Sequence, residues 1–96
     1  MTERADEIHE TLSKRPRRTA LWLVKQEGTV SVAELVTHLS GDDDEIRVQL
    51  AHNHLPGLAD TDYVEYDQES GKISKGPQFD EIEPVLEFFE TYANRA

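Results

Sequence analysis

Apolar residues recur along the chain at helical spacing in some segments and at strand spacing in others. Ile8 and Leu12 lie one helical turn apart in a polar opening segment, which predicts a short first helix. A longer helix is expected next, with Ser13 as a candidate N-cap, Pro16 in its first turn and Gly28 as its stop. Its apolar face consists of Ala20, Leu21, Leu23 and Val24.

The next apolar run follows a capping box, in which Ser31 and Glu34 are three residues apart. This pattern predicts a helix that ends at Ser40–Gly41. Its apolar positions are Leu35, Val36 and Leu39.

A further helix is predicted from about Glu45 to Leu58, with one of Asp42 to Asp44 as its cap. Pro56 is awkward inside a helix, so we expect a kink or an early last turn there. Arg47 projects toward the core side, where we expect an ion pair with one of the many acids. The core side holds Val48, Leu50, Ala51, Leu55 and Leu58. The outward side holds Glu45, Gln49, His52 and Asn53.

A β-hairpin is predicted directly after this helix. Val64 and Tyr66 alternate with two acidic residues, as in a strand with one buried face. The stretch "DQESGK" supplies a turn that contains glycine, and Ile73 returns on a second strand. Helices followed by such a hairpin predict an α+β winged helix-turn-helix within residues 1–76, with the hairpin as its wing.

Residues 77–96 predict a C-terminal helix that starts near Pro84, because proline disfavours helix at the residue before it. Its apolar side chains cover more than one narrow stripe, and they either complete the monomer core or pair with a second copy. We favour a symmetric dimer, since an exposed apolar patch of that size is a liability. The dimerisation residues are Val85, Leu86, Phe88, Phe89 and Tyr92.

The composition narrows the class of protein. The chain has 96 residues, no cysteine, and 20 acidic against 10 basic residues, for a formal charge of −10 at pH 7. The length allows one small domain, and no stretch is apolar enough for a membrane span, so we expect a cytoplasmic protein. The acidic residues are spread over the whole chain, a distribution that favours an origin in an organism whose proteins work in molar salt. At such salt the Coulomb field is screened within about 3 Å, so net charge says little about a DNA partner.

One basic cluster stands out in this acidic chain. Residues 14–25, "KRPRRTALWLVK", contain five bases and no acid. Arg17 and Arg18 offer planar donor forks for phosphates, and Lys72 and Lys75 beside the hairpin are further candidates. Gln49 and Asn53 are residue types that recognise adenine edges in the major groove, and His52 lies on the same outward face.

Neither an enzyme nor a metal site is indicated. His52 and His54 are two residues apart, so on a helix they point about 200° apart and cannot share a metal. The chain has no glycine-rich phosphate loop and no GxSxG motif, and paired carboxylates carry no information at this acidity. We therefore expect no catalytic residues, no metal and no cofactor.

Three stretches, "LSKRPRRTALWLVKQEG", "VSVAELVTHLS" and "IRVQLAHNHLPGLADTDYVEYDQESGKI", resemble the small winged helix-turn-helix domains of haloarchaea. Most members of that family have no assigned function, and the resemblance, which covers roughly residues 8–75, implies a transcription regulator. Pro16 and Asp62 depart from its pattern, since Asp62 stands where a glycine is expected before the wing. The matching residues are Arg15, Arg17, Arg18, Val32, Glu34, Leu35, His54, Leu55, Pro56, Leu58, Val64, Tyr66 and Asp67.

The expected function is a dimeric, sequence-specific regulator that binds double-stranded DNA with residues 45–58 in the major groove. The expected DNA-binding residues are Arg17, Arg18, Gln49, His52, Asn53, Lys72 and Lys75. The alternative is a winged helix that binds a protein partner and no DNA, with Arg17 and Arg18 in intramolecular ion pairs. A switch that responds to a small molecule or a metal is a third option, for which the sequence shows no pocket signature.

Overall fold

A computed structural model describes residues 3–95 of the chain, with side chains from Arg4 to Glu90. The described chain is α+β, as expected, with helices around a small antiparallel sheet. In chain order the elements are α1 (Glu3–Leu12), α2 (Arg15–Glu27), β1 (Thr29–Ser31), α3 (Val32–Thr37), α4 (Asp43–Gln49), the π-helical segment η1 (Leu50–His54), α5 (Leu55–Asp60), β2 (Val64–Asp67), β3 (Lys72–Lys75) and α6 (Phe79–Arg95). Among these described residues, no helix is long and apolar enough to cross a membrane.

The sheet has three strands in the order β1-β3-β2, and both pairings are antiparallel. The hairpin β2–β3 is the one that the sequence predicts, with the buried Ile73 opposite Tyr66 on one side. On its other side Ile73 lies opposite Val30 of β1. Strand β1 was not predicted, because a strand of three residues is too short to show an alternating pattern.

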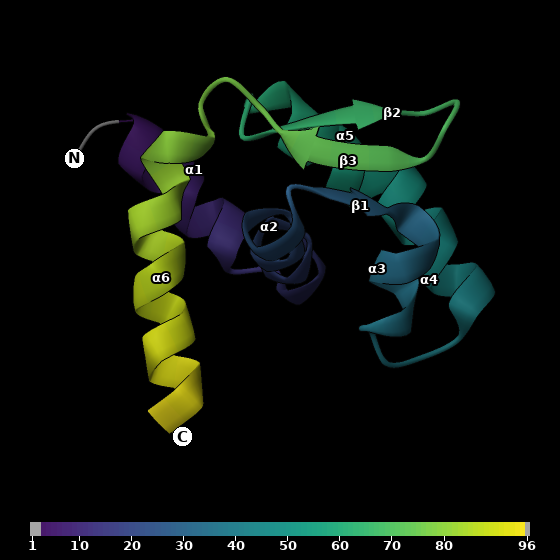
Figure 1. Ribbon diagram of the computed structural model, residues 1–96, viewed down its shortest axis with the longest axis horizontal. Helices are drawn as coiled ribbons and strands as arrows, with labels where there is room; N and C mark the ends of the chain where they lie inside the picture. Colours follow the sequence, from purple (N-terminus) through teal and green to yellow (C-terminus); the bar gives the residue numbers. More distant parts are fainter. Residues whose placement is uncertain (1–2, 96) are drawn as a thin grey trace.

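Helix α2 lies at the centre of the molecule (Figure 1). Helices α1 and α6 lie on one side of it, α3 and α4 on the other, and the sheet runs along a third side (Figure 1). The predicted apolar face of α2 is buried, and Gly28 ends the helix with φ of 83°. The core is contiguous and contains Leu12, Ala20, Leu21, Leu23, Val24, Val30, Leu35, Val36, Leu50, Leu55, Leu58, Tyr63, Val64, Ile73, Phe79, Ile82 and Leu86.

Two of the predicted helix caps are present. The Ser31 hydroxyl accepts a hydrogen bond from the backbone N–H of Glu34 at 3.0 Å. Asp42 caps α4 in the same way, accepting from the N–H of Glu45 at 3.0 Å. Each cap satisfies a backbone donor that the first helical turn leaves without a partner, which fixes where the helix begins.

The prediction for Ser13 was wrong. Lys14 occupies the N-cap position of α2 without a side-chain cap, and the Ser13 hydroxyl donates instead to the carbonyl oxygen of Glu10. Ser13 therefore closes the end of α1 rather than the start of α2. Helix α3 also ends at Thr37, three residues before the predicted Ser40, with His38 at its C-cap.

The helix predicted over residues 45–58 runs from Asp43 to Asp60 and contains the π-helical turn η1, which ends two residues before Pro56. Of the two outcomes expected at Pro56, a kink or an early last turn, the early last turn was wrong, because the helix continues to Asp60. In a strict α-helix Leu50 and Leu55 would be about 140° apart. The looser π turn brings them nearer to one face, and both are buried.

Two predictions on the core side of this helix were wrong. Val48 is 54% exposed rather than buried, because it precedes Leu50 by two residues and so points to nearly the opposite side of α4. Arg47 is exposed as well, and none of the ion pairs among the described residues includes it. Leu50 and the partly buried Ile46, one helical turn apart, mark the side of this helix that packs on the core.

Helix α6 begins at Phe79, five residues before Pro84, so the predicted start was wrong. Pro84 lacks the N–H that would donate to the preceding turn, which costs the helix one hydrogen bond. The extra turn is retained because it carries Phe79 and Ile82 into the core, where they are 2% and 0% exposed. Burial of each such side chain is worth about 1.5–3 kcal/mol, enough to offset the lost bond.

Candidate functional site

The first turn of α2 is strongly basic. Lys14 at the N-cap is followed by Arg15, Arg17 and Arg18, and no acidic residue is present in that turn. The N-terminal end of a helix carries a partial positive charge, so side-chain carboxylates are favourable there and cations are not. Four cations at this end therefore cost stability and favour the approach of an anion.

The fold places this basic turn beside η1. The Arg17 guanidinium donates from Nε to Nδ1 of His54 at 3.2 Å and from Nη2 to Oδ1 of Asn53 at 3.4 Å. It also lies against Gly57, where an added Cβ would be 2.8 Å from Nη2 of Arg17. Arg17 thus covers the surface between Asn53, His54 and Gly57. No local sequence pattern signals these contacts, because the partners are 36 and 37 residues away.

His54 is held in its neutral form. Partial burial lowers its pKa from 6.5, and the positive charges of Arg17 and Lys14 lower it further. Because Nδ1 accepts the bond from Arg17, that nitrogen carries no proton, and the ring proton lies on Nε2. The Arg17–His54 pair is therefore a hydrogen bond between a cation and a neutral ring.

Gln49, His52 and Asn53 are all exposed on the outward side of α4 and η1, as predicted. Asn53 accepts a hydrogen bond from Arg17, and Gln49 lines a pocket together with Arg15. The structure therefore brings Arg17 against Asn53, whereas His52 is exposed on the same helix. Arg15, which was not among the predicted site residues, lines the pocket beside Gln49.

A pocket of about 340 Å³ lies where α2, the α3–α4 connection and η1 meet. Arg15 and His54 contribute basic groups to its lining, and Asp42 and Glu45 contribute carboxylates. The remaining lining residues are Pro16, Leu39, Ser40, Gly41, Ile46, Gln49 and Leu50. The sequence pattern shows no such pocket, because its walls come from segments that only the fold places together.

Arg18 and Lys75 do not join this group. Arg18 donates from Nη1 to the carbonyl oxygen of Leu12 at 2.6 Å, and its guanidinium carbon lies 6.0 Å from the ring centre of Phe89. Lys75 lies over the ring of Phe79 at 5.2 Å. Both cations thus lie against residues of α6 and not beside Arg17.

Lys72 is exposed at the start of β3, opposite Asp67 in the hairpin. The turn that joins β2 to β3 lies on the same side of the molecule as α3 and α4 (Figure 1). Of the two predicted hairpin lysines, Lys72 is the one next to this turn.

The predicted dimerisation residues divide into two groups. Leu86 is 2% exposed and belongs to the monomer core, and Val85 packs partly buried against it. Phe88 and Phe89 are 60% and 42% exposed, whereas the side chain of Tyr92 lies outside the described residues. The role assigned to Leu86 was therefore wrong, because the inner face of α6 is needed to close the monomer.

A third aromatic side chain lies on the neighbouring helix. Trp22 of α2 is 38% exposed and lies on the same helical face as Arg18 and Lys25. Arg18 contacts Phe89, and Lys25 forms an ion pair with Glu90 at 3.3 Å. The exposed large apolar side chains of these two helices are Trp22 on α2 and Phe88 and Phe89 on α6.

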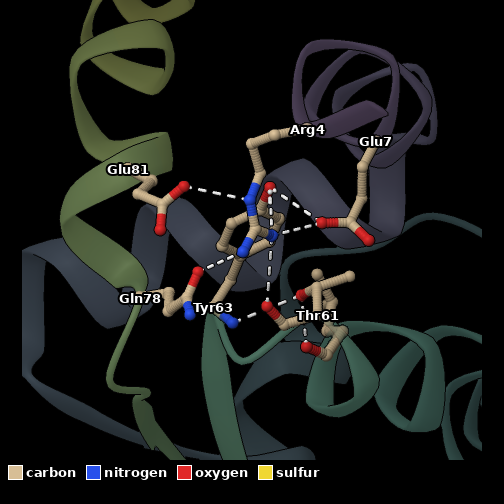
Figure 2. Close-up of polar contacts among 7 residues, drawn as sticks. Arg4, Glu7, Thr61, Tyr63, Gln78 and Glu81 are labelled. Carbon is tan, nitrogen blue, oxygen red and sulfur yellow. Dashed lines mark hydrogen bonds and ion pairs between the residues drawn. The ribbon is translucent and has the colours of Figure 1, made fainter. Parts of the chain in front are cut away.

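A separate polar cluster surrounds Arg4 and has a structural role (Figure 2). Arg4 pairs with Glu7 and with Glu81, the latter at 2.9 Å, and its guanidinium carbon lies 5.3 Å from the ring centre of Tyr63. It also donates to the side chain of Gln78. These contacts join α1, the start of β2 and α6, so the cluster closes the core around Tyr63.

Comparison with known proteins assigns the chain to a family but does not indicate an activity. The family model described as a domain of unknown function (DUF7344) matches residues 9–74. No curated protein and no solved structure matches the chain. The matched stretch contains the whole of α2, the outward helix face and most of the hairpin.

Proposed function

We propose that this chain, which belongs to the DUF7344 family of domains of unknown function, is a sequence-specific DNA-binding regulator with a winged-helix fold. The order of its elements supports the fold. Helices α2, α3 and α4–α5 are followed by the hairpin β2–β3, and the hairpin pairs with β1 between the first two of these helices. In this proposal α4 and η1 enter the major groove and the hairpin is the wing.

One observation carries the proposal: the basic first turn of α2 lies directly against the exposed polar face of α4 and η1. Phosphate contacts position a protein on the duplex, and base contacts supply sequence specificity. Lys14 and Arg15 at the positive end of α2 suit the first role, together with Lys72 of the wing. The residues for the base contacts are Gln49, His52 and Asn53.

The acidic surface sets a condition on this function. Asp43, Asp44 and Glu45 are exposed in the first turn of α4 and would repel phosphates in dilute buffer. In molar salt the screening length falls to about 3 Å, so such repulsion acts only at contact. We therefore propose that the protein works at high salt, like the haloarchaeal domains that it resembles.

We further propose that two copies pair through the exposed side chains of Trp22, Phe88 and Phe89. A two-fold dimer would cover these side chains on both copies and present two recognition helices. Half-sites about 34 Å apart would then match one turn of the DNA duplex.

The test is a selection from a random duplex DNA pool in molar KCl, in which non-specific binding by counterion release is largely abolished. We expect an enriched palindrome. Replacing Gln49 and Asn53 together by alanine should abolish the enrichment and leave the circular dichroism spectrum and the Tm unchanged. Folded wild-type protein that enriches no sequence would contradict the proposal.

A protein-binding module is the second candidate. The exposed carboxylates at the entry to α4 favour it, and so does Arg17, whose guanidinium is already hydrogen bonded within the chain. In this case the outward helix face would dock on a basic partner. Binding to a purified basic partner that the Gln49 and Asn53 substitutions abolish, without any DNA enrichment, would support this second function.

A further inference from the structure

The contact between Arg17 and Asn53 determines which end of the Asn53 amide faces outward. A guanidinium has only N–H donors, so the atom of Asn53 that faces it must be the carbonyl oxygen. This is the observed geometry, with Nη2 of Arg17 at 3.4 Å from Oδ1 of Asn53. The side chain of Asn53 is exposed, and its NH₂ group is therefore the end left for a partner.

This orientation changes the base that Asn53 suits. Asparagine recognises adenine with both ends of its amide, since the oxygen accepts from N6 and the nitrogen donates to N7. Here the oxygen faces Arg17, and the positive charge beside it disfavours a further donor such as adenine N6. Guanine presents two acceptors, N7 and O6, at the same edge.

Arg17 adds a positive charge at the same place. A guanidinium has five N–H groups, of which Nε donates to His54 and one on Nη2 donates to Asn53. The exposed end of the Asn53 amide, beside this cation, is therefore a surface that only donates. Such a surface matches a base edge that only accepts.

We infer that Asn53, oriented by Arg17, selects guanine rather than adenine at the base it faces, and that Arg17 is a positioning residue for specificity. This inference rests on the proposed DNA-binding function. It replaces the adenine preference that the residue types alone suggest.

Gly57 offers a way to test the role of Arg17 without removing its charge. A Cβ at position 57 would lie 2.8 Å from Nη2 and 3.1 Å from Cζ of Arg17, so alanine displaces the guanidinium from its place over η1 and α5. The atoms displaced are the far end of a flexible side chain, and alanine favours helix over glycine, so the fold should be preserved. Arg17→Lys is a second variant, because lysine keeps the charge but lacks the fork that contacts both His54 and Asn53.

The experiment is the DNA selection in molar KCl, run with the wild type, Asn53→Ala, Gly57→Ala and Arg17→Lys. Arg18→Lys is the matched control, because Arg18 contacts Leu12 and Phe89 on the other side of α2. We expect guanine in the wild-type motif at one position whose preference Asn53→Ala removes. At that position Gly57→Ala and Arg17→Lys should raise the adenine-to-guanine ratio by roughly tenfold, while Arg18→Lys leaves it unchanged.

The outcomes separate this inference from the proposed function. A wild-type motif with adenine at the position that depends on Asn53 would overturn the role of Arg17 and leave DNA binding intact. The same holds if Asn53→Ala relaxes no position, or if both Gly57→Ala and Arg17→Lys keep the guanine. No enriched motif from any folded variant would overturn the proposed function, and this inference with it.

Discussion

Gly76 lies against the backbone of Asp62, so close that a Cβ at position 76 would come within 2.3 Å of the Asp62 carbonyl oxygen. Two backbone hydrogen bonds hold this approach, from Gly76 N–H to the Tyr63 carbonyl and from Gln78 N–H to the Asp62 carbonyl, both at 2.9 Å. Asp62 itself has φ of 66°, the one positive value among the non-glycine residues described. The turn before β2 therefore demands the backbone conformation for which a glycine was expected.

Replacing Gly76 by alanine should destabilise the fold more than the same replacement at a glycine whose φ is positive but whose Cβ would meet no neighbour. The new Cβ would clash with backbone atoms of Asp62 and Tyr63. These atoms cannot move without breaking the two backbone hydrogen bonds at the start of β2. We expect a loss of at least about 2–3 kcal/mol in the free energy of unfolding. Urea unfolding at fixed salt measures it.

Gly28→Ala is the matched control for that substitution. Gly28 has φ of 83°, and a Cβ added there would have no atom within 4 Å, so alanine meets strain but no clash. Its cost should be about 1 kcal/mol. Equal losses for the two variants would show that the approach of Gly76 to Asp62 has no energetic consequence.

Stability should fall as the pH drops below the ordinary His54 pKa of 6.5. Burial, Arg17 and Lys14 lower this pKa in the folded state, so the unfolded chain binds the proton more tightly. Its contribution to stability is thus complete above pH 6.5 and is lost as the pH falls through the lowered value. Urea unfolding of wild type and His54→Asn at neutral and at mildly acidic pH isolates the effect, because asparagine retains an acceptor for Arg17 and does not titrate. Parallel pH profiles would exclude His54 as the cause.

The protein should lose stability in dilute buffer and regain it in molar KCl. Glu34 and Glu27 lie close together, and their hydrogen bond, together with partial desolvation and their repulsion, raises the pKa of Glu34. A raised carboxylate pKa means that stability is lost as the pH rises above the ordinary value, so at neutral pH this pair destabilises the fold. Thermal unfolding against KCl concentration is the measurement.

Glu34→Gln should raise the Tm in dilute buffer at neutral pH, and the gain should shrink in molar KCl as screening removes the repulsion. Glutamine also suits the third position of the capping box at Ser31. Glu65→Gln is the control, since Glu65 is exposed on β2 and its cross-strand partner is Ser74. A wild-type Tm that does not depend on salt would refute the high-salt proposal.

Replacing Phe88 and Phe89 by serine should convert a dimer into a folded monomer. Both side chains are exposed in the single copy, so their loss removes interface area without opening a cavity. Light scattering in molar KCl gives the mass, and the Tm extrapolated to low concentration reports the monomer. Leu86→Ala is the contrasting variant, because it should cost about 2–5 kcal/mol through the core instead. A monomeric wild type would exclude pairing through these exposed side chains.

The sequence alone predicted the features that depend on neighbours within one or two turns. The apolar face of α2, the caps at Ser31 and Asp42, the stop at Gly28 and the hairpin around Ile73 all follow from local spacing and local hydrogen bonds. The outward face of Gln49, His52 and Asn53 was predicted for the same reason. A cap or a periodic stripe is decided by residues three or four positions apart, and these are visible in the chain order.

Tertiary contacts decided the rest. The π turn that lets both Leu50 and Leu55 be buried, the three-residue β1 and the early start of α6 each gain their stability from packing against elements distant in sequence. The same distinction applies to the candidate site. The sequence places arginines at the start of α2, but only the fold directs Arg17 to Asn53 and Arg18 to Phe89. A long, flexible cation can reach several partners at little cost in its own conformational energy. The packing of α2 between η1 and α6 determines which partner each arginine contacts.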